Sequence, residues 1–265
     1  MKQKINGISV NTFGDSSKQT IIFVHGFPYD HTMWQNQIDF LHKNYFCVAY
    51  DVRGLGESTV GDGQYMMELF VDDLLSIITE LNLVKPVICG LSMGGYIALR
   101  AMERNQELFG GLILCDTKAD ADGNAAKLNR AINISMINNE GLVKFTDMFV
   151  TNCFAEETPK QNEKMFLTTL YKSQKNDPAG VKGCIIAIMS RTDTTNYLHQ
   201  IKIPTLVICG AFDKLTPTPI MRTLAEKIPN SEFASIPFAG HMSPLENPEC
   251  VNDLMKGFLD KNFTS

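Results

Sequence analysis

A serine between glycines is the residue of this chain best suited to covalent chemistry. Ser92 stands in the run GLSMGG at 90–95, between a strand-like run, PVIC at 86–89, and a helix-like run, YIALR at 96–100. A strand that turns sharply into a helix exposes the side chain at the turn and needs flanking glycines, because Cβ atoms would collide with neighbouring backbone. Backbone N–H groups at the helix start then point toward any anion formed beside the serine. The pattern predicts a nucleophile; the alternative is a tight glycine turn with an incidental serine.

Two later segments offer the base and the acid that a weakly nucleophilic serine hydroxyl needs. Asp213 follows the apolar run LVICG at 206–210, and His241 follows the next strand-like run. The carboxyl ends of parallel strands meet at one sheet edge, so we expect His241 to take the Ser92 proton while Asp213 orients the imidazole. Asp116, directly after LILC at 112–115, is a second candidate for the acid. Asp213 is favoured because its loop has the glycine-then-acid layout.

A third glycine turn predicts the donors for a developing oxyanion. The run HGFP at 25–28 follows a strand-like segment, and the backbone N–H groups of Phe27 and Met93 are the expected donors. His25 is expected to order this turn by hydrogen bonding. Trp34 is a candidate pocket residue, although a single tryptophan suits a core equally well. Of the remaining histidines, His42 and His199 are expected to be structural and His31 to be a loop residue.

The elements that position these residues alternate between short β-branched runs and amphipathic helices. The expected strands are Ile8–Thr12, Thr20–Val24, Phe46–Tyr50, Pro86–Cys89, Leu112–Cys115, Thr205–Cys209 and Glu232–Ile236. The expected helices among them are 67–81, Tyr96–Asn105 and Pro248–Leu259. Strands that are apolar throughout indicate helices on both faces, so the pattern predicts an α/β fold with a mostly parallel, doubly wound sheet.

The strand–helix alternation stops between about 117 and 200. Only helical patterns occur there: Leu128–Ile137, Gly141–Phe149, Lys160–Lys172 and Pro178–Ser190. We expect a helical cap at 117–200, inserted into a core domain formed by 1–116 and 201–265. Methionines in the cap could fill gaps in its core or cover an apolar substrate. The candidate pocket residues among them are Met136, Met148 and Met189.

Composition excludes several classes of function. The 265 residues are 44% hydrophobic and 20% charged, with a formal net charge of −5 and no Lys/Arg block, so no nucleic-acid partner is expected. No apolar run approaches the about 20 residues that span a bilayer, and the N-terminal stretch lacks the apolar core of a secretory signal. Seven cysteines without a CxxC pair indicate reduced thiols and a cytoplasmic location.

No cofactor and no metal are expected. The five histidines lack HxxxH or HExxH spacing, and GLSMGG has a serine where the middle glycine of a dinucleotide-binding motif would stand. The expected partner is a small-molecule substrate, and the sequence leaves the oligomeric state open.

Five motifs together resemble the α/β-hydrolase superfamily over nearly the whole chain. They are HGFP (25–28), DVRGLGES (51–58), GLSMGG (90–95), LVICGAFDKLTP (206–217) and AGHMSPLENP (239–248). Within the superfamily, GLSMGG, LILCDT (112–117) and DTTNYLHQIKIPTLVI (193–208) are most similar to the enol-lactonase and carboxylesterase branch. The resemblance implies a triad of Ser92, Asp213 and His241, a helical cap at 117–200, and loop-bracing roles for Asp51 and Arg53.

The favoured function is hydrolysis of a small to medium apolar carboxylic ester or lactone through an acyl-enzyme on Ser92. A serine at the turn argues against haloalkane dehalogenase and epoxide hydrolase chemistry, which need a carboxylate there. The same triad could pass the acyl group to peroxide or another acceptor, as in cofactor-free perhydrolases (haloperoxidases) and acyltransferases. A third hypothesis is ligand binding without turnover.

Overall fold

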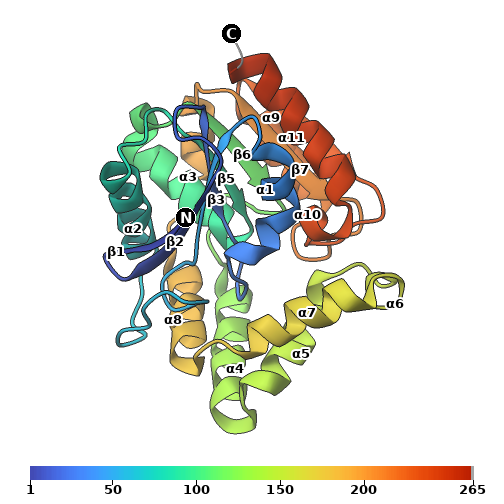
Figure 1. Ribbon diagram of the computed structural model, residues 1–265. Helices are drawn as coiled ribbons and strands as arrows, with labels where there is room; N and C mark the ends of the chain where they lie inside the picture. The colour runs from blue at the N-terminus through green and yellow to red at the C-terminus, as the bar shows by residue number, and fades with distance from the viewer. Residues whose placement is uncertain (264–265) are drawn as a thin grey trace.

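Short apolar runs rich in β-branched residues form the central strands of the eight-stranded sheet in the middle of the protein (Figure 1). The computed structural model describes residues 1–263. The strands are β1 (Lys2–Ile5), β2 (Ile8–Phe13), β3 (Thr20–Val24), β4 (Phe46–Tyr50), β5 (Val87–Leu91), β6 (Gly111–Cys115), β7 (Thr205–Gly210) and β8 (Ser231–Ile236).

The strand order in space is β1-β2-β4-β3-β5-β6-β7-β8. Strands β1 and β2 are antiparallel to their neighbours, and all pairs from β4 to β8 are parallel. The loops that follow β3, β5, β6, β7 and β8 therefore leave the sheet on the side formed by the carboxyl ends of the strands, which we call the carboxyl edge. Ligands bind on this side in open parallel sheets.

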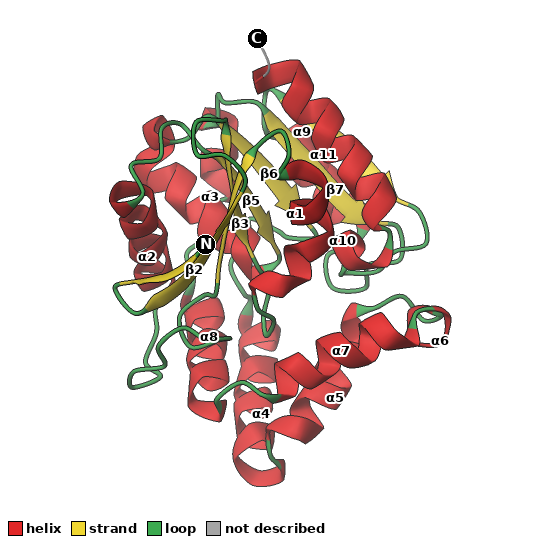
Figure 2. Cartoon of the chain, in the orientation of Figure 1, coloured by secondary structure: helices red, strands yellow, loops and turns green. Residues whose placement is uncertain are grey.

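Side chains of the central strands alternate between two hydrophobic layers. Ile22 and Val24 of β3 join the cluster under α2 (Met67–Glu80), α3 (Met93–Asn105) and α9 (Thr218–Glu226). Ile21 and Phe23 join the cluster under α1 (Gln35–Leu41) and α11 (Pro248–Phe263). Helices thus cover both faces of a mostly parallel sheet, which confirms the predicted doubly wound α/β fold (Figure 2).

Between β6 and β7 the chain forms helices and no strand. These are α4 (Asn124–Glu140), α5 (Leu142–Cys153), α6 (Thr158–Gln161), α7 (Glu163–Gln174), α8 (Pro178–Ser190) and the 3₁₀ helix η3 (Thr195–Gln200). We call residues 117–200 the helical insertion; its four longer helices gather at one end of the sheet, at the bottom of Figure 1. Its buried Ile137, Phe145 and Val181 belong to the same hydrophobic cluster as α2 and α3, so the insertion shares a hydrophobic core with these helices.

All seven expected strands are present, within one or two residues at each end. Strand β1 was not expected, because its sequence KQKI carries three polar residues and lies at the sheet edge, where only Ile5 is buried. Helix α3 begins at Met93, three residues before the expected start. The short elements η1 (His31–Trp34), η2 (Gln106–Leu108) and α10 (Ser243–Glu246) complete the described chain. Within residues 1–263, no helix combines the length and apolarity needed to cross a membrane.

Candidate active site

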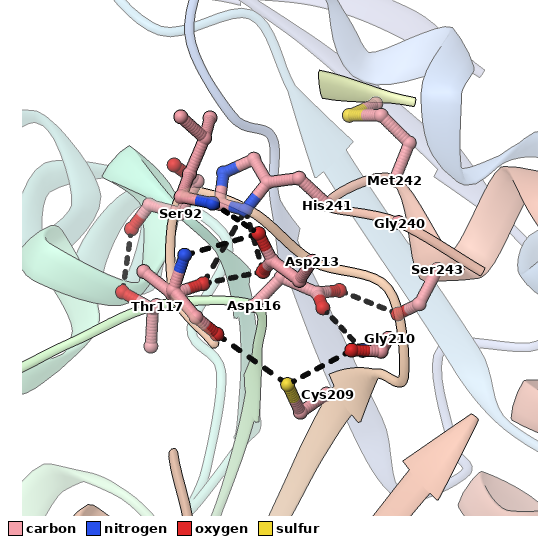
Figure 3. Close-up of polar contacts among 12 residues, drawn as sticks. Ser92, Asp116, Thr117, Cys209, Gly210, Asp213, Gly240, His241, Met242 and Ser243 are labelled. Atoms are coloured by element: carbon pink, nitrogen blue, oxygen red, sulfur yellow. Dashed lines mark hydrogen bonds and ion pairs between the residues drawn. The ribbon is translucent and has the colours of Figure 1, made fainter. Parts of the chain in front are cut away.

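Ser92 occupies the sharp turn between β5 and α3, with φ 52° and ψ −111°. A Cβ at Gly90 would lie 2.3 Å from the carbonyl oxygen of Gly94, and a Cβ at Gly94 would lie 2.2 Å from that of Val24. Both positions therefore require glycine. The Thr117 hydroxyl donates to the Ser92 carbonyl oxygen at 2.8 Å and helps to fix the turn (Figure 3). A left-handed φ at a serine is sterically costly and is typical of an exposed nucleophile.

Asp213 and His241 form a buried pair at the same edge. The Nδ1 atom of His241 donates to Oδ2 of Asp213 at 2.8 Å, and both residues are 5% exposed or less. Leu215 and Thr216 add backbone N–H donors to Oδ1 at 2.8 and 3.0 Å, and the Thr216 hydroxyl binds Oδ2. Burial alone would raise the pKa of Asp213, but the His241 charge and these hydrogen bonds lower it to about 2. An ionised Asp213 holds the proton on Nδ1 and leaves Nε2 as the acceptor.

Backbone hydrogen bonds connect the loops that carry these residues to the ends of the neighbouring strands. Ser92 N–H donates to the carbonyl oxygen of Cys115, Asp116 N–H to that of Ile208, and Ala211 N–H to that of Ile236. Figure 3 shows the His241 ring directed toward Ser92. Among the described residues, no hydrogen bond joins the Ser92 hydroxyl to this ring. Direct contact between nucleophile and base therefore stays a prediction.

Asp116 has a different environment from Asp213. Its Oδ1 accepts the Gly210 N–H at 2.7 Å, and its Oδ2 accepts the Ser243 hydroxyl. Complete burial and the nearby charge of Asp213 raise the pKa of Asp116 well above its usual value. The carboxyl group of Asp116 thus links the end of β7 to α10, while Asp213 holds the imidazole. This geometry supports Asp213 as the orienting acid.

The expected oxyanion donors lie on turns packed against each other. A Cβ at Gly26 would lie 2.6 Å from Cδ2 of Leu91 and 3.5 Å from Cβ of Ser92. Within the described chain the Phe27 N–H has no hydrogen-bond acceptor. Met93 is the first residue of α3, and first-turn N–H groups lack an acceptor in their own helix. Both groups are available to an oxygen beside Ser92, and their role stays a prediction.

His25 orders the Phe27 turn, as expected. Its Nε2 accepts the Val52 N–H at 2.8 Å, so Nδ1 carries the proton and donates to the Gly26 carbonyl oxygen. Burial lowers the pKa of His25, which is fully buried and neutral. A neutral, doubly hydrogen-bonded imidazole is a structural brace.

The DVRGLGES segment is fixed by two further charged groups. Asp51 accepts the backbone N–H and Nδ1 of His31 at 2.9 and 2.6 Å, and the Arg53 guanidinium binds both carboxylate oxygens of Asp73. Burial opposes ionisation of Asp51, but the hydrogen bond and charge of His31 lower its pKa to about 2. These contacts agree with the loop-bracing roles implied for Asp51 and Arg53.

Aromatic side chains of the helical insertion pack against the turn that carries Phe27. The Phe27 ring packs edge-on against Phe149 of α5 with centroids 5.3 Å apart, and Phe145 lies 6.1 Å away. Sequence reasoning missed Phe145 and Phe149, which follow the apolar face of an amphipathic helix and look like core residues. Of the two alternatives for Trp34, the structure shows the core position and not a pocket position, because its ring is fully buried against Phe23 at 5.3 Å, in the layer under α1.

The three candidate methionines of the helical insertion have different surroundings. Met136 is partly buried against the hydrophobic cluster, Met148 is 49% exposed, and Met189 is partly buried near the end of α8. Of these, Met148 lines a cavity of about 580 Å³ together with Phe149 and Lys214. Lys214 follows Asp213 directly, so this cavity lies beside the acid loop.

Three potential metal ligands come together in the described chain: Asp116, Cys209 and Asp213, whose donor atoms lie within 4.8 Å of one another. All of them are already hydrogen-bonded inside the protein, the Cys209 thiol to carbonyl oxygens of Gly210 and Thr216. Burial raises the pKa of Cys209 to about 12, and metals bind the thiolate. The group fits a hydrogen-bond network better than a metal site.

An eight-stranded, mostly parallel sheet with a serine on a strained strand–helix turn and an Asp–His pair at its carboxyl edge defines the α/β-hydrolase class. The family model described as the alpha/beta hydrolase fold matches residues 19–248. The chain belongs to this family.

Similar proteins include esterases and lactonases. An esterase from Thermogutta terrifontis is 33% identical, with a TM-score of 0.94 and complete coverage of both chains. 3-Oxoadipate enol-lactonase 2 from Acinetobacter baylyi is 27% identical over 94% of this chain and 92% of its own. A Mycobacterium tuberculosis protein whose name carries the words non-heme bromoperoxidase is 26% identical over 83% of this chain and 85% of its own. The chain is thus similar to an esterase and to an enol-lactonase, which agrees with the resemblance to the enol-lactonase and carboxylesterase branch.

Proposed function

We propose that the protein is a serine hydrolase that cleaves carboxylic esters or lactones through an acyl-enzyme. The observation that carries this proposal is the buried Asp213–His241 pair, with Nδ1 to Oδ2 at 2.8 Å, at the sheet edge that also carries Ser92 on its strained turn. The esterase and enol-lactonase among the similar proteins support the same reaction class.

Each step uses a group with a defined position. The Ser92 oxygen attacks the substrate carbonyl carbon while Nε2 of His241 takes the hydroxyl proton, and Asp213 stabilises the imidazolium. The carbonyl oxygen becomes an oxyanion that accepts the N–H groups of Phe27 and Met93. Collapse breaks the acyl C–O bond, and the leaving alkoxide takes the proton from His241. In a lactone this alcohol remains tethered to the acyl group. Water activated by His241 then releases the acid and restores Ser92.

An apolar acyl group of small to medium size fits the residues around the turn. Phe27, Phe145 and Phe149 form an aromatic cluster beside the turn, and Phe149 and Met148 also line the cavity beside Lys214. Apolar walls with few polar groups are typical of ligand sites. Activity against p-nitrophenyl acetate, butyrate and octanoate, with an enol-lactone and a saturated lactone in parallel, identifies the preferred substrate.

A second candidate differs only in the acceptor of the acyl group. In a perhydrolase, hydrogen peroxide attacks the acyl-Ser92 ester and leaves as a peracid, and the serine regains its proton. The relative with bromoperoxidase in its name favours testing this reaction. Bromination that depends on both peroxide and acetate would identify it, and transfer of the acyl group to an added alcohol would identify an acyltransferase.

The decisive variant is Ser92→Ala. It should abolish hydrolysis of p-nitrophenyl acetate and labelling by a fluorophosphonate probe while the fold is retained. Hydrolysis at the wild-type rate would refute the proposal. Absence of labelling in the wild-type protein would favour ligand binding without turnover.

We further propose a reducing location such as the cytoplasm. All seven cysteines are free, and all except Cys250 are buried, as small core residues are. If the cells are lysed directly into denaturant that contains an alkylating reagent, all seven cysteines should be alkylated, and a disulfide would contradict this location.

A further inference from the structure

The loop around His241 is held by one carboxylate. Glu246 is the last residue of α10, and its Oε1 accepts the backbone N–H groups of Gly240 and Met242 at 2.8 and 3.2 Å. These two residues flank His241 on either side. Glu246 therefore fixes the backbone on both sides of the proposed base.

The other oxygen of Glu246 binds the helical insertion. Its Oε2 accepts the Ala155 N–H at 2.8 Å and the Thr158 hydroxyl at 2.5 Å, both at the junction of α5 and α6. A charged acceptor forms stronger hydrogen bonds than a neutral one. Four donors from two parts of the chain thus converge on one side chain.

Backbone contacts join the same two segments directly. The His241 N–H donates to the Cys153 carbonyl oxygen at 2.8 Å, at the end of α5. A Cβ at Gly240 would lie 2.5 Å from the Ala155 nitrogen, so only glycine allows this approach. Three consecutive N–H groups, from Gly240 to Met242, are therefore bound either by Glu246 or by the insertion.

We propose that Glu246 is a positioning residue that holds the His241 loop and the α5–α6 junction of the insertion in one fixed arrangement. This inference rests on the proposed function, in which His241 is the base. Because the same carboxylate binds both segments, a displacement of the insertion at Thr158 changes the support of the imidazole. The orientation of the base is thereby coupled to the position of the helices that cover the substrate.

The first test is Glu246→Gln, which keeps the size of the side chain but turns an NH₂ group toward two N–H donors or toward Ala155 and Thr158. A misplaced catalytic group lowers the rate by up to about 100-fold. We expect kcat for p-nitrophenyl acetate to fall about 10- to 100-fold, with KM changed less than about threefold, while the thermal transition remains cooperative. The matched control is Glu249→Gln, on the exposed surface three residues later, which should leave kcat unchanged.

The second test removes a single donor on the insertion side. Thr158→Val keeps the shape of the side chain and leaves every contact of Gly240 and Met242 with the carboxylate intact. We expect faster hydrogen exchange in a peptide that covers 238–243, although the substitution is in the insertion. This measurement needs no activity and applies even where Glu246→Gln fails to fold.

Two outcomes would overturn the inference. One is wild-type kcat in Glu246→Gln, and the other is unchanged exchange of the 238–243 peptide in Thr158→Val. Measuring Ser92→Ala in the same assay distinguishes a failure of the positioning role of Glu246 from a failure of the proposed function. If Ser92→Ala is inactive and Glu246→Gln is normal, only the positioning role is wrong; if Ser92→Ala is active, the proposed function itself is wrong.

Discussion

The imidazole of His241 donates its Nδ1 proton to Oδ2 of Asp213 over 2.8 Å, and the same oxygen accepts the Thr216 hydroxyl at 2.5 Å. The pair comes from the loops after β7 and β8, which are neighbouring parallel strands. A Cβ at Gly210 would lie 1.9 Å from the Gly240 carbonyl oxygen, so the two loops are in backbone contact where the acid and the base meet. The geometry of the pair therefore depends on glycine at this position as well as on the two side chains.

Asp213→Asn tests the role of the acid. The amide cannot stabilise an imidazolium, and its NH₂ group can force the wrong tautomer, as in serine hydrolases in which this change costs about 10⁴-fold. We expect kcat for p-nitrophenyl acetate to fall at least about 100-fold with little change in KM. Steady-state kinetics at pH 7 to 8 measures this.

Asp116→Asn is the matched control. Burial and the nearby charge of Asp213 raise the pKa of Asp116, and an asparagine at this position can still accept from Gly210 and contact Ser243. Its kcat should stay within about threefold of wild type, because neither hydrogen bond is to a reacting group. The opposite result, with Asp116→Asn inactive and Asp213→Asn active, would transfer the role of the acid to Asp116.

The stability of the protein in acid should depend on Asp51. Its pKa is lowered from 3.8 to about 2 by His31, despite burial. A group with a lowered folded-state pKa contributes stability above pH 3.8 and loses that contribution as the pH falls toward 2. The difference in unfolding free energy between wild type and Asp51→Asn should therefore shrink by about 2 kcal/mol between pH 4 and pH 2.

Urea unfolding of both proteins across this range measures the difference. Taking the difference in unfolding free energy between the two proteins cancels the contributions of Asp73, Asp116 and Glu246 to the pH dependence. Burial raises the pKa of these three groups, so their contributions have the opposite sign. A constant difference from pH 4 to pH 2 would contradict the role of the Asp51–His31 pair.

Two glycine-to-alanine changes should have opposite effects on the stability of the protein. At Gly94 the added Cβ would lie 2.2 Å from the Val24 carbonyl oxygen, so α3 must shift away from β3 and the Ser92 turn must distort. We expect Gly94→Ala to lose at least about 3 kcal/mol of stability, or to fail to fold. At Gly257, in the exposed middle of α11, nothing lies within 4 Å of the added Cβ, and Gly257→Ala should gain about 0.5–1 kcal/mol. Thermal unfolding distinguishes the two, and equal effects would contradict the geometry of the turn.

The residues of the triad could be proposed from the sequence because their chemistry depends on residue type and chain order. A serine after one strand, and an acid and a histidine after later strands, must lie at one edge once the strands are parallel. The same reasoning could not find Glu246, since its role depends on donors from Ala155 and Thr158, about 90 residues away along the chain. Nothing in the sequence around Ala155 indicates such a partner.

Residues whose role depends on packing were predicted less well. Trp34 is in the layer under α1, and no local pattern distinguishes a buried tryptophan from one that faces a pocket. Phe145 and Phe149 have the helical spacing of core residues, and their contact with Phe27 depends on how α5 crosses the turn after β3. Tertiary packing, which single-sequence patterns do not encode, decides all three positions.

Phe149 links the helical insertion to the proposed oxyanion turn, so its removal should affect turnover as well as binding. Its ring meets Phe27 edge-on at a centroid distance of 5.3 Å, a contact worth about 0.5–1.5 kcal/mol beyond the buried area. If this contact holds the Phe27 N–H in place, Phe149→Ala should lower kcat for p-nitrophenyl acetate about threefold to tenfold. Met148→Ala, at the neighbouring exposed position that lines the cavity, should raise KM for p-nitrophenyl octanoate and leave kcat for the acetate unchanged. Equal kcat in the two variants would mean that His25 and the glycine contacts alone fix the turn.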